Sequence, residues 1–193
     1  NNPELLPIEN FEQYFHLSRV KHGGTFRTTR PDAASVEALR QAVIFQMTYP
    51  GAPMIYYGTE VGLWGANDPC DRQTMLWDDV AYEPETHTPG GVTRANKRAP
   101  DKKLFAFYQD AIAMRQSHAV LRRGSLSWKP SPNDRVLVFE REHEGVRVRV
   151  ILNAGKKPAK VKLPFSGVDL WSGVLVARGN VSVPPRGWLV IRK

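Results

Sequence analysis

The chain has little cysteine and no long apolar run, and these absences limit what it can be. Among its 193 residues Cys70 is the only cysteine, so no disulfide can form within the chain. No apolar stretch approaches the roughly 20 residues that a membrane-spanning helix needs. The N-terminal NNPELLPIENF has neither region of a signal peptide and no initiator Met, so we expect the chain to begin inside a longer protein. A lone cysteine is compatible with the cytoplasm, which we favour, and with secretion, so the compartment stays open.

Common cofactor and metal motifs are also missing. The sequence has no G-x-S-x-G, no Walker loop and no dinucleotide fingerprint, and its Gly-Gly pairs at 23–24 and 90–91 are turn signals. The five histidines lack the spacing of metal ligands, and Cys70 has no partner at C-x-x-C distance. We therefore expect no cofactor and no structural metal.

The net charge of +8 raises the question of a nucleic-acid partner. Basic residues are spread over the whole chain and mixed with acids, and the densest clusters are pairs at 97–98, 122–123 and 156–157. Such a distribution is typical of a solvated surface. Nucleic-acid binding would call for clustered Arg and Lys interleaved with exposed aromatics, which the sequence lacks. We expect neither a nucleic-acid nor a membrane partner.

Helical spacing predicts two helices in the first part of the chain. The first is SVEALRQAVIFQM (35–47), which Asp32 or Ser35 could cap. The second is DKKLFAFYQDAIAMRQSH (101–118), with Asp101 at its N-terminus. The expected buried stripes are Val36, Leu39, Val43 and Met47 in the first helix, and Leu104, Phe105, Tyr108 and Ile112 in the second.

A short apolar stretch and a long loop separate these helices. MIYYG (54–58) is too short for a helix and rich in β-forming residues, which predicts a strand buried on both faces, as in a parallel sheet. The segment 58–100 is rich in Gly, Pro, Asp and Asn. Loops of this length in compact domains tend to be functional or disordered.

Beyond about residue 124 the hydrophobic period changes to two. Short alternating segments, separated by turn signals, predict an antiparallel sandwich or barrel. These segments are 135–142, 146–153, 159–164, 168–172, 180–183 and 187–193. The predicted fold class is therefore α/β followed by an all-β module, with the boundary near 120–126.

Three charged residues of the long loop are candidates for binding. Glu60 lies two residues past the expected strand, and in a βα-barrel the C-terminal strand ends face the active site. A carboxylate there could equally cap or hydrogen-bond the amides of the loop. Asp68 and Arg72 could bind substrate hydroxyls as an ion pair or merely pin the loop, and their spacing alone favours the pin.

Aromatic residues are dense in the same part of the chain. They are Tyr56, Tyr57, Trp64, Trp77 and Tyr82. Aromatic faces suit the C–H surfaces of sugars, whereas packing in a core is the more frequent role of such residues. Composition leaves both interpretations open.

The stretch LRQAVIFQMTYPGAPMIYYGTEVGLWGANDP…R…MLWDD resembles the last helix–strand unit of the catalytic barrel of the α-amylase family of glycoside hydrolases. The similarity is to the neopullulanase, cyclomaltodextrinase and maltogenic-amylase branch. YEPETHTPGG and LFAFYQDAIAMRQSHAVLRRGS resemble the following loop and the eighth barrel helix, and the β-rich tail resembles the C-terminal sandwich domain. The resemblance runs from about residue 30 and is most specific over 39–77.

The resemblance implies a fold and a domain boundary. Residues 1–122 would be the last βα portion of a (β/α)8 TIM barrel: seventh helix, eighth strand, eighth helix and loops. Residues 123–193 would be an antiparallel β-sandwich. A whole barrel needs about 250 residues. The family's catalytic carboxylates lie on earlier strands, and His16 is not followed by the Asp of the seventh-strand motif. No catalytic residue is therefore expected in this chain, which should be inactive by itself.

What carries over by resemblance is a set of sugar-binding positions. Asp68 and Arg72 match a pair that helps to form a donor-side subsite, and Glu60 matches the acid after the eighth strand. Trp64 and Tyr57 match its surroundings. Thr74 stands where the family has Pro, which puts the shape of the loop in doubt.

The resemblance also implies a parent activity. That parent would be a retaining hydrolase of α-1,4 bonds in cyclodextrins, pullulan or maltooligosaccharides, with α-1,6 bonds as an open alternative. A non-catalytic carbohydrate-binding or interaction module is the alternative reading. Expected partners are an α-glucan oligosaccharide and either the rest of the barrel or a second copy bound through exposed barrel edges. In a chain alone, the helices could instead pack back onto the sandwich.

Overall fold

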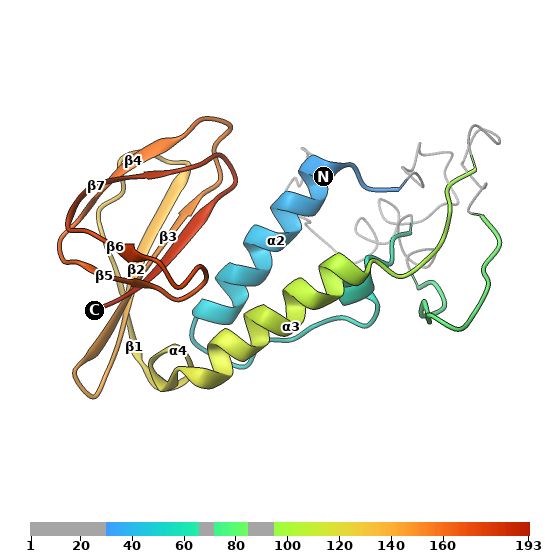
Figure 1. The fold of residues 1–193 in the computed structure, drawn as a ribbon, viewed down its shortest axis with the longest axis horizontal. Coiled ribbons are helices and arrows are strands. Elements are labelled where there is room, and N and C mark those ends of the chain that lie inside the picture. Colours follow the sequence, from blue (N-terminus) through green and yellow to red (C-terminus); the bar gives the residue numbers. More distant parts are fainter. Residues whose placement is uncertain (1–29, 66–71, 85–94) are drawn as a thin grey trace, which may run out of the picture. The chain divides into compact units, whose positions relative to one another are not determined.

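The computed structural model describes residues 30–65, 72–84 and 95–193 (Figure 1). These fall into two compact units. One comprises the described residues of 55–104, and the other comprises 32–54 together with 105–193. None of the helices in the described ranges is long and apolar enough to cross a membrane.

The first predicted helix is present as α2, Ala33–Thr48. Its N-cap is Asp32, whose Oδ1 accepts a hydrogen bond from the backbone N–H of Ser35 at 2.8 Å, and this confirms one of the two predicted caps. Val43 and Met47 of the predicted stripe are buried. α2 ends before Pro50, as proline requires.

The second predicted helix is present as α3, Lys102–Ser117, and a short helix α4, Ala119–Arg123, follows it. Asp101 caps α3, since its Oδ1 accepts from the backbone N–H of Leu104 at 3.0 Å. The predicted stripe is wrong at Phe105, which is 43% exposed. Phe107 is buried instead, with its ring 4.8 Å from that of Trp171.

The remainder of the chain forms two antiparallel sheets, as predicted. We call residues 125–193 the β-module. Its larger sheet has the order β1-β2-β3-β8-β5-β6, and its smaller sheet pairs β4 with β7. The strands are β1 Ser125–Trp128, β2 Val136–His143, β3 Val146–Asn153, β4 Ala159–Leu163, β5 Gly167–Asp169, β6 Leu175–Val176, β7 Gly179–Val183 and β8 Trp188–Arg192. The short strands β1 and β6 were not predicted from the sequence.

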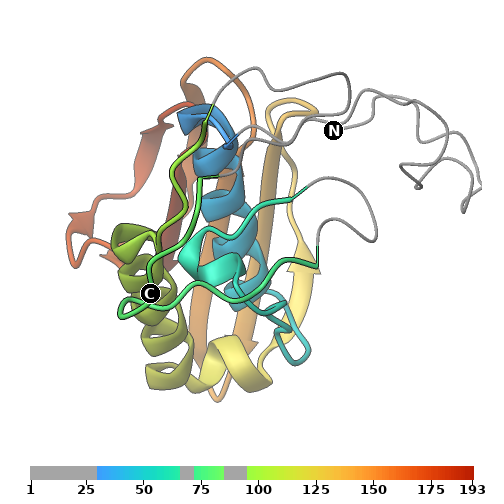
Figure 2. The same ribbon diagram turned by 90° about the vertical axis from the view of Figure 1, so that its right-hand side faces the viewer.

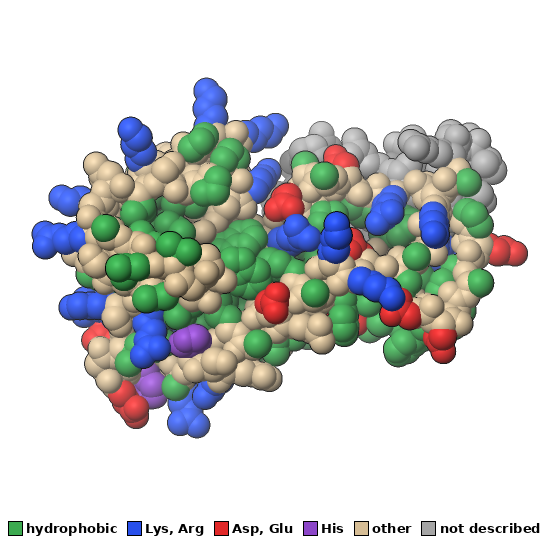
Figure 3. Space-filling view, viewed as in Figure 1, with side chains coloured by type: hydrophobic (Ala, Val, Ile, Leu, Met, Phe, Trp, Pro, Cys, Tyr) green, Lys and Arg blue, Asp and Glu red, His purple; other side chains and the backbone are tan. Residues whose placement is uncertain are grey.

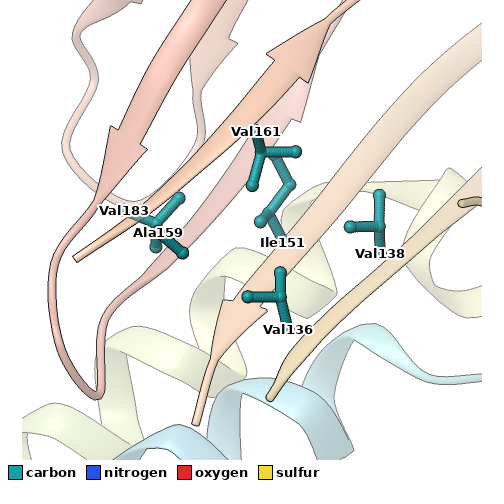
Figure 4. Close-up of a cluster of buried hydrophobic side chains, with 6 residues drawn as sticks. All are labelled: Val136, Val138, Ile151, Ala159, Val161 and Val183. Atoms are coloured by element: carbon teal, nitrogen blue, oxygen red, sulfur yellow. The ribbon is translucent and has the colours of Figure 1, made fainter. Parts of the chain in front are cut away.

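The two sheets pack through a layer of small aliphatic side chains (Figure 4). This cluster comprises Val136, Val138, Ile151, Ala159, Val161 and Val183, contributed by β2, β3, β4 and β7. Val138 and Ile151 are cross-strand partners, so the register of β2 and β3 places them on the same face. Because side chains alternate between the two faces of a strand, every second residue of β2 and β3 packs against the smaller sheet.

Helices cover the opposite face of the larger sheet, and α2 lies across it in the view of Figure 2. The side-chain amide of Gln41 in α2 donates to the carbonyl oxygen of Asn153 in β3 at 2.9 Å. The ring of Phe139 in β2 meets those of Phe45 and Tyr49 edge-on at 6.1 and 6.2 Å. α2 therefore packs onto the β-module, which was one of the two outcomes expected for its apolar face.

Two buried arginines tie the helix ends to the sheet. The guanidinium of Arg141, fully buried in β2, donates to the carbonyls of Thr48, Leu121 and Gly124 at 2.5, 2.9 and 2.7 Å. Arg115 donates to the carbonyls of α2's last turn and of Gly51. Burial lowers the pKa of both groups, and the charge of Arg115 lowers that of Arg141 further. These groups satisfy carbonyls that a helix C-terminus leaves unpaired.

The predicted strand at 54–58 is wrong for this chain. Residues 52–56 have no regular secondary structure, and Tyr57 and Gly58 lie in a turn. Met54 is 78% exposed and Tyr56 is 52% exposed, rather than buried on both faces. A parallel strand forms only by hydrogen bonding to neighbouring strands. The described part of the chain offers no strand that pairs with this stretch.

Candidate functional site

The predicted sugar-binding residues that can be placed lie in the 55–104 unit. Glu60 lies within a single turn of 3-10 helix, η2, which spans Thr59–Val61. Tyr57 and Trp64 lie on either side of this turn in the sequence. Arg72 is exposed farther along the chain. Asp68 lies outside the described residues, so the expected Asp68–Arg72 pair remains a prediction.

Two glycines determine the path of the chain around η2. Gly58 and Gly62 have φ of 82° and 72°, a region that other residues adopt only with strain. The backbone N–H of Leu63 donates to the carbonyl of Gly58 at 2.8 Å and closes the turn. A Cβ on Gly58 would lie 2.5 Å from Leu63 Cδ2, so no other residue fits without a shift.

Glu60 lies in the middle of η2 and carries one of two buried unpaired polar atoms among the described residues of this unit. Its Oε2 is buried and has no hydrogen-bond partner within the described part of the chain. A buried carboxylate oxygen normally accepts a hydrogen bond, because an unpaired one is costly. Such an atom suits a ligand hydroxyl or a donor from another part of a larger protein.

Tyr57 joins the η2 segment to the next described stretch. Its phenolic O–H donates to the backbone carbonyl of Gln73 at 2.9 Å. The ring remains 44% exposed and lies 4.8 Å from that of Tyr56. The structure therefore brings Tyr57 close to Gln73, which follows Arg72 in the chain.

A second anchor in this unit was not predicted. The phenol of Tyr82 accepts from the N–H of Trp77 at 2.7 Å and donates to the carbonyl of Met75 at 2.9 Å. The Arg98 guanidinium lies 5.7 Å from the centre of the Tyr82 ring. Arg98 Nη2, like Glu60 Oε2, is buried and unpaired within the described residues. No local pattern singles out Arg98, because it is one of many basic residues in a loop.

The loop is attached to the start of α3 by two further contacts. The backbone N–H of Asp101 donates to the carbonyl of Val61, the last residue of η2, at 2.9 Å. Lys102 forms an exposed ion pair with Asp78 at 3.3 Å. Together the unit presents an acid, an exposed arginine and aromatic rings, which is chemistry for holding a polyhydroxylated ligand.

Several characterised enzymes are similar to this chain over part of their length. A cyclomaltodextrinase of a Bacillus species is 39% identical over 119 residues, covering 61% of this chain and 18% of the enzyme. Neopullulanase 2 of Thermoactinomyces vulgaris is 34% identical over 135 residues, covering 68% of this chain and 20% of the enzyme. The chain is homologous to part of the α-amylase-family glucan hydrolases. It spans about a fifth of these relatives. No protein-family model matches.

Solved structures agree with this similarity. A cyclomaltodextrinase structure is 32% identical, with a TM-score of 0.63 over 81% of this chain and 26% of the other. An α-amylase of Geobacillus thermoleovorans in complex with acarbose is 18% identical, with a TM-score of 0.65 over 81% of this chain and 33% of the other. AmyP in complex with maltose is 17% identical at a TM-score of 0.60, over 83% and 35% of the two chains. The last two comparisons concern the fold alone.

Proposed function

We propose that this chain is the C-terminal part of a retaining α-glucan hydrolase. The intact enzyme would act on α-1,4 bonds of cyclodextrins, pullulan or maltooligosaccharides, with α-1,6 bonds as the alternative. The observation that carries the proposal is the 39% identity to a cyclomaltodextrinase over a stretch that makes up only 18% of that enzyme.

Within this proposal the chain has two domains of unequal completeness. Residues 1–122 supply the seventh helix, eighth strand and eighth helix of the catalytic barrel, and residues 123–193 are the C-terminal sandwich. The two packed sheets of the β-module support the second assignment. The missing pairing at 54–58 supports the first, because an eighth barrel strand needs a first and a seventh strand beside it.

The substrate-binding residues are Tyr57, Glu60, Trp64, Asp68 and Arg72. The unpaired Oε2 of Glu60 supports this role, as does the link from Tyr57 to Gln73 beside Arg72. They bind glucan hydroxyls and do no chemistry, since retaining hydrolysis needs a nucleophile and an acid/base. We assign both to the remainder of the barrel, and this chain by itself is inactive.

A chimera tests this function. The matching last part of the Bacillus cyclomaltodextrinase is replaced by this chain, and hydrolysis of a cyclodextrin is measured. We expect activity from the chimera and none from the chain alone. Glu60→Gln should lower the chimera's kcat/KM about 10- to 100-fold by weakening a charged hydrogen bond. Glu83→Gln, an exposed acid of the same unit, is the matched control. A chimera that melts cooperatively but leaves the substrate intact would contradict the proposal.

A non-catalytic glucan-binding module is the second candidate. Exposed Trp77 beside the Tyr82 anchor favours it, because an aromatic platform can bind sugar without catalysis. Calorimetric titration of the chain alone with maltoheptaose separates the two. Binding that is lost in Trp77→Ala, together with an inactive chimera, would favour the module.

The same proposal concerns the partner. Exposed Met54 and Tyr56 would contact the remainder of the barrel, or a second copy when the rest is absent. Light scattering of the chain alone should show concentration-dependent association. Met54→Glu with Tyr56→Glu should abolish it, whereas Val174→Glu, an exposed apolar residue of the β-module, should not.

A further inference from the structure

The charge of the chain is concentrated in one segment. Residues 1–124 contain 14 Lys and Arg against 14 Asp and Glu, whereas residues 125–193 contain 13 against five. The expectation that basic residues are spread evenly is therefore wrong: their density rises beyond residue 124, while the density of acids falls. The β-module therefore carries the whole net charge of +8. In Figure 3, Lys and Arg side chains project around its outer margin, over β4 and β7.

Four of the five acids of the β-module precede Gly145 in the sequence. Beyond Glu144 the sequence contains a single acid, Asp169. It is buried, and its carboxylate accepts from the Ser172 hydroxyl at 2.6 Å and the Val190 N–H at 2.9 Å. From Gly145 to the last residue, no exposed carboxylate is available to neutralise a lysine.

A groove runs along β4 within this basic surface. Its volume is about 510 Å³, which lies in the range of small-ligand sites. Its polar lining includes Lys129, Arg149, Lys160, Lys162 and Asn180, and three prolines contribute to its wall. Lys162 and Asn180 are cross-strand partners in β4 and β7, so their side chains leave the same face of the small sheet.

Two of these cations, Lys129 and Arg149, share one buried carboxylate, which offsets a single positive charge. Glu140 is buried, and its Oε1 accepts from Arg149 at 2.7 Å while its Oε2 contacts Lys129 at 3.2 Å. Burial would raise the pKa of Glu140, but the hydrogen bonds from Arg149 and Lys129 outweigh it, and the pKa is lowered. Arg149 is also held by the carbonyl of Lys162. Both carboxylate oxygens of Glu140 are therefore engaged by side chains that line the groove.

The other two cations have no such partner. Lys160 and Lys162 alternate with buried residues along β4, so both side chains are exposed. Neither forms a salt bridge within the described part of the chain. Exposed lysines on a short edge strand often do no more than prevent aggregation. Here, however, they line a groove together with the Asn180 amide, which is a neutral hydrogen-bonding group suited to hydroxyls.

We propose that this groove binds a phosphate monoester carried by a sugar, with Lys160 and Lys162 contacting the phosphate and Asn180 the sugar hydroxyls. The sugar part rests on the proposed glucan function. No exposed aromatic lines the groove, which disfavours stacking of nucleic-acid bases or of a neutral sugar. The same ester could be part of a glucan chain or of a free sugar phosphate, and the experiment distinguishes these sources.

The test is calorimetric titration of the 193-residue chain at about 0.1 M salt. The probes are glucose 6-phosphate, glucose, inorganic phosphate, a phosphorylated dextrin and the same dextrin after dephosphorylation. We expect glucose 6-phosphate to bind more tightly than inorganic phosphate, and glucose not to bind at this groove. Tighter binding of the phosphorylated dextrin than of glucose 6-phosphate would identify a glucan-borne ester. The reverse order would identify a free sugar phosphate.

Paired variants with equal charge make the assignment specific. Lys160→Gln with Lys162→Gln should weaken glucose 6-phosphate binding at least tenfold. Lys156→Gln with Lys157→Gln removes the same charge from exposed lysines that precede β4 and do not line the groove. This control should change the affinity less than threefold. All four side chains are exposed, so both double variants should fold.

Several results would overturn the inference. An equal loss of affinity in the two double variants would show that overall charge, and not the groove, accounts for binding. Absent phosphosugar binding would reject the groove, and a 20-base-pair DNA duplex bound through the same two lysines would assign it to nucleic acid. Maltoheptaose binding without phosphosugar binding would remove only this inference. Phosphosugar binding with an inactive chimera would remove only the proposed hydrolase function.

Discussion

The β-module and the 55–104 unit differ in how far their polar groups are satisfied. In the β-module the backbone pairs strand to strand, and even a fully buried guanidinium finds carbonyl acceptors. In the 55–104 unit the regular structure described apart from the start of α3 is one turn of 3-10 helix, and Glu60 and Arg98 keep buried unpaired atoms. The acceptors of that guanidinium lie in α2 and just after α4, so the β-module is satisfied together with these helices, although Arg40 Nε of α2 is also buried and unpaired. Under the proposed function, the 55–104 unit differs in that its missing partners lie in the remainder of a barrel.

The largest expected loss of stability follows from replacing Arg141, the buried arginine that joins the β-module to the helix ends. Arg141→Met removes a donor from the buried carbonyls of Thr48 and Gly124, whereas the carbonyl of Leu121 keeps its hydrogen bond from Arg115. Because each unsatisfied buried acceptor costs about 1–3 kcal/mol, the free energy of unfolding should fall by at least about 2 kcal/mol. Urea unfolding measures it. Replacement of an exposed arginine, Arg135→Met, should change stability by less than about 0.5 kcal/mol. Equal effects of the two variants would show that the hydrogen bonds of Arg141 do not stabilise the fold.

The next largest loss of stability is expected at Gly58 in the 55–104 unit. Comparing Gly58 with Gly145 separates the cost of a strained backbone from the cost of a steric clash. Gly58 and Gly145 have similar φ, 82° and 78°, but only at Gly58 would a Cβ meet another atom, on Leu63. Gly145→Ala should cost about 1 kcal/mol from the left-handed backbone alone. Gly58→Ala should cost clearly more and speed hydrogen exchange of the Leu63 amide. Equal costs would show that the Leu63 side chain simply moves away.

Glu140 in the β-module should make the folding stability depend on pH. The folded-state pKa of Glu140 lies below its ordinary value of 4.5, so its carboxylate stabilises the fold above that value. This stabilisation is lost as pH falls through the lowered folded-state pKa. Wild-type stability should therefore drop on acidification below about pH 4.5, and Glu140→Gln should flatten that part of the profile. The urea midpoint at several pH values measures this, and unchanged slopes would contradict it.

The smallest effect is the N-cap of α2. Asp32→Ala removes the acceptor of the Ser35 N–H and should cost about 1 kcal/mol. Glu37→Ala, which removes a partly exposed ion pair with Arg40, should cost about 0.5 kcal/mol or less. Thermal melts of the two variants give the comparison. A larger loss in Glu37→Ala would show that the cap is not what holds the helix start.

Local patterns predicted most of the fold, and the failures have non-local causes. Helix periodicity and caps located α2 and α3, and alternation located six of the strands. β6 has only two residues, and β1 shows no alternation between buried and exposed residues. The 54–58 segment has a strand composition, but pairing depends on other strands. Arg141 lies between Glu140 and Glu142 in the sequence, like a solvent-facing side chain, yet it is fully buried where the helix ends meet β2.

The site was predictable to a lesser degree. Resemblance put Glu60 after a strand that contains Tyr57, whereas in the structure Tyr57 lies in a turn and Glu60 in η2. The binding role of these residues and of Trp64 stays a prediction. Resemblance could not reveal that Glu60 Oε2 lacks a partner, since that depends on the fold around it. Nothing in the sequence distinguishes Arg98 from other loop arginines, because its contact with Tyr82 joins residues 16 positions apart.

Native-state hydrogen exchange, compared between the chain alone and the cyclomaltodextrinase chimera, tests the central claim most directly. Val150 and Val190 of the β-module should exchange at similar, slow rates in both proteins. Leu63 and Asp101, whose amides bond to Gly58 and Val61, should exchange rapidly in the chain alone and at least about tenfold more slowly in the chimera. If Leu63 and Asp101 are as protected as Val150 in the chain alone, the 55–104 unit is complete without a partner and the account is wrong.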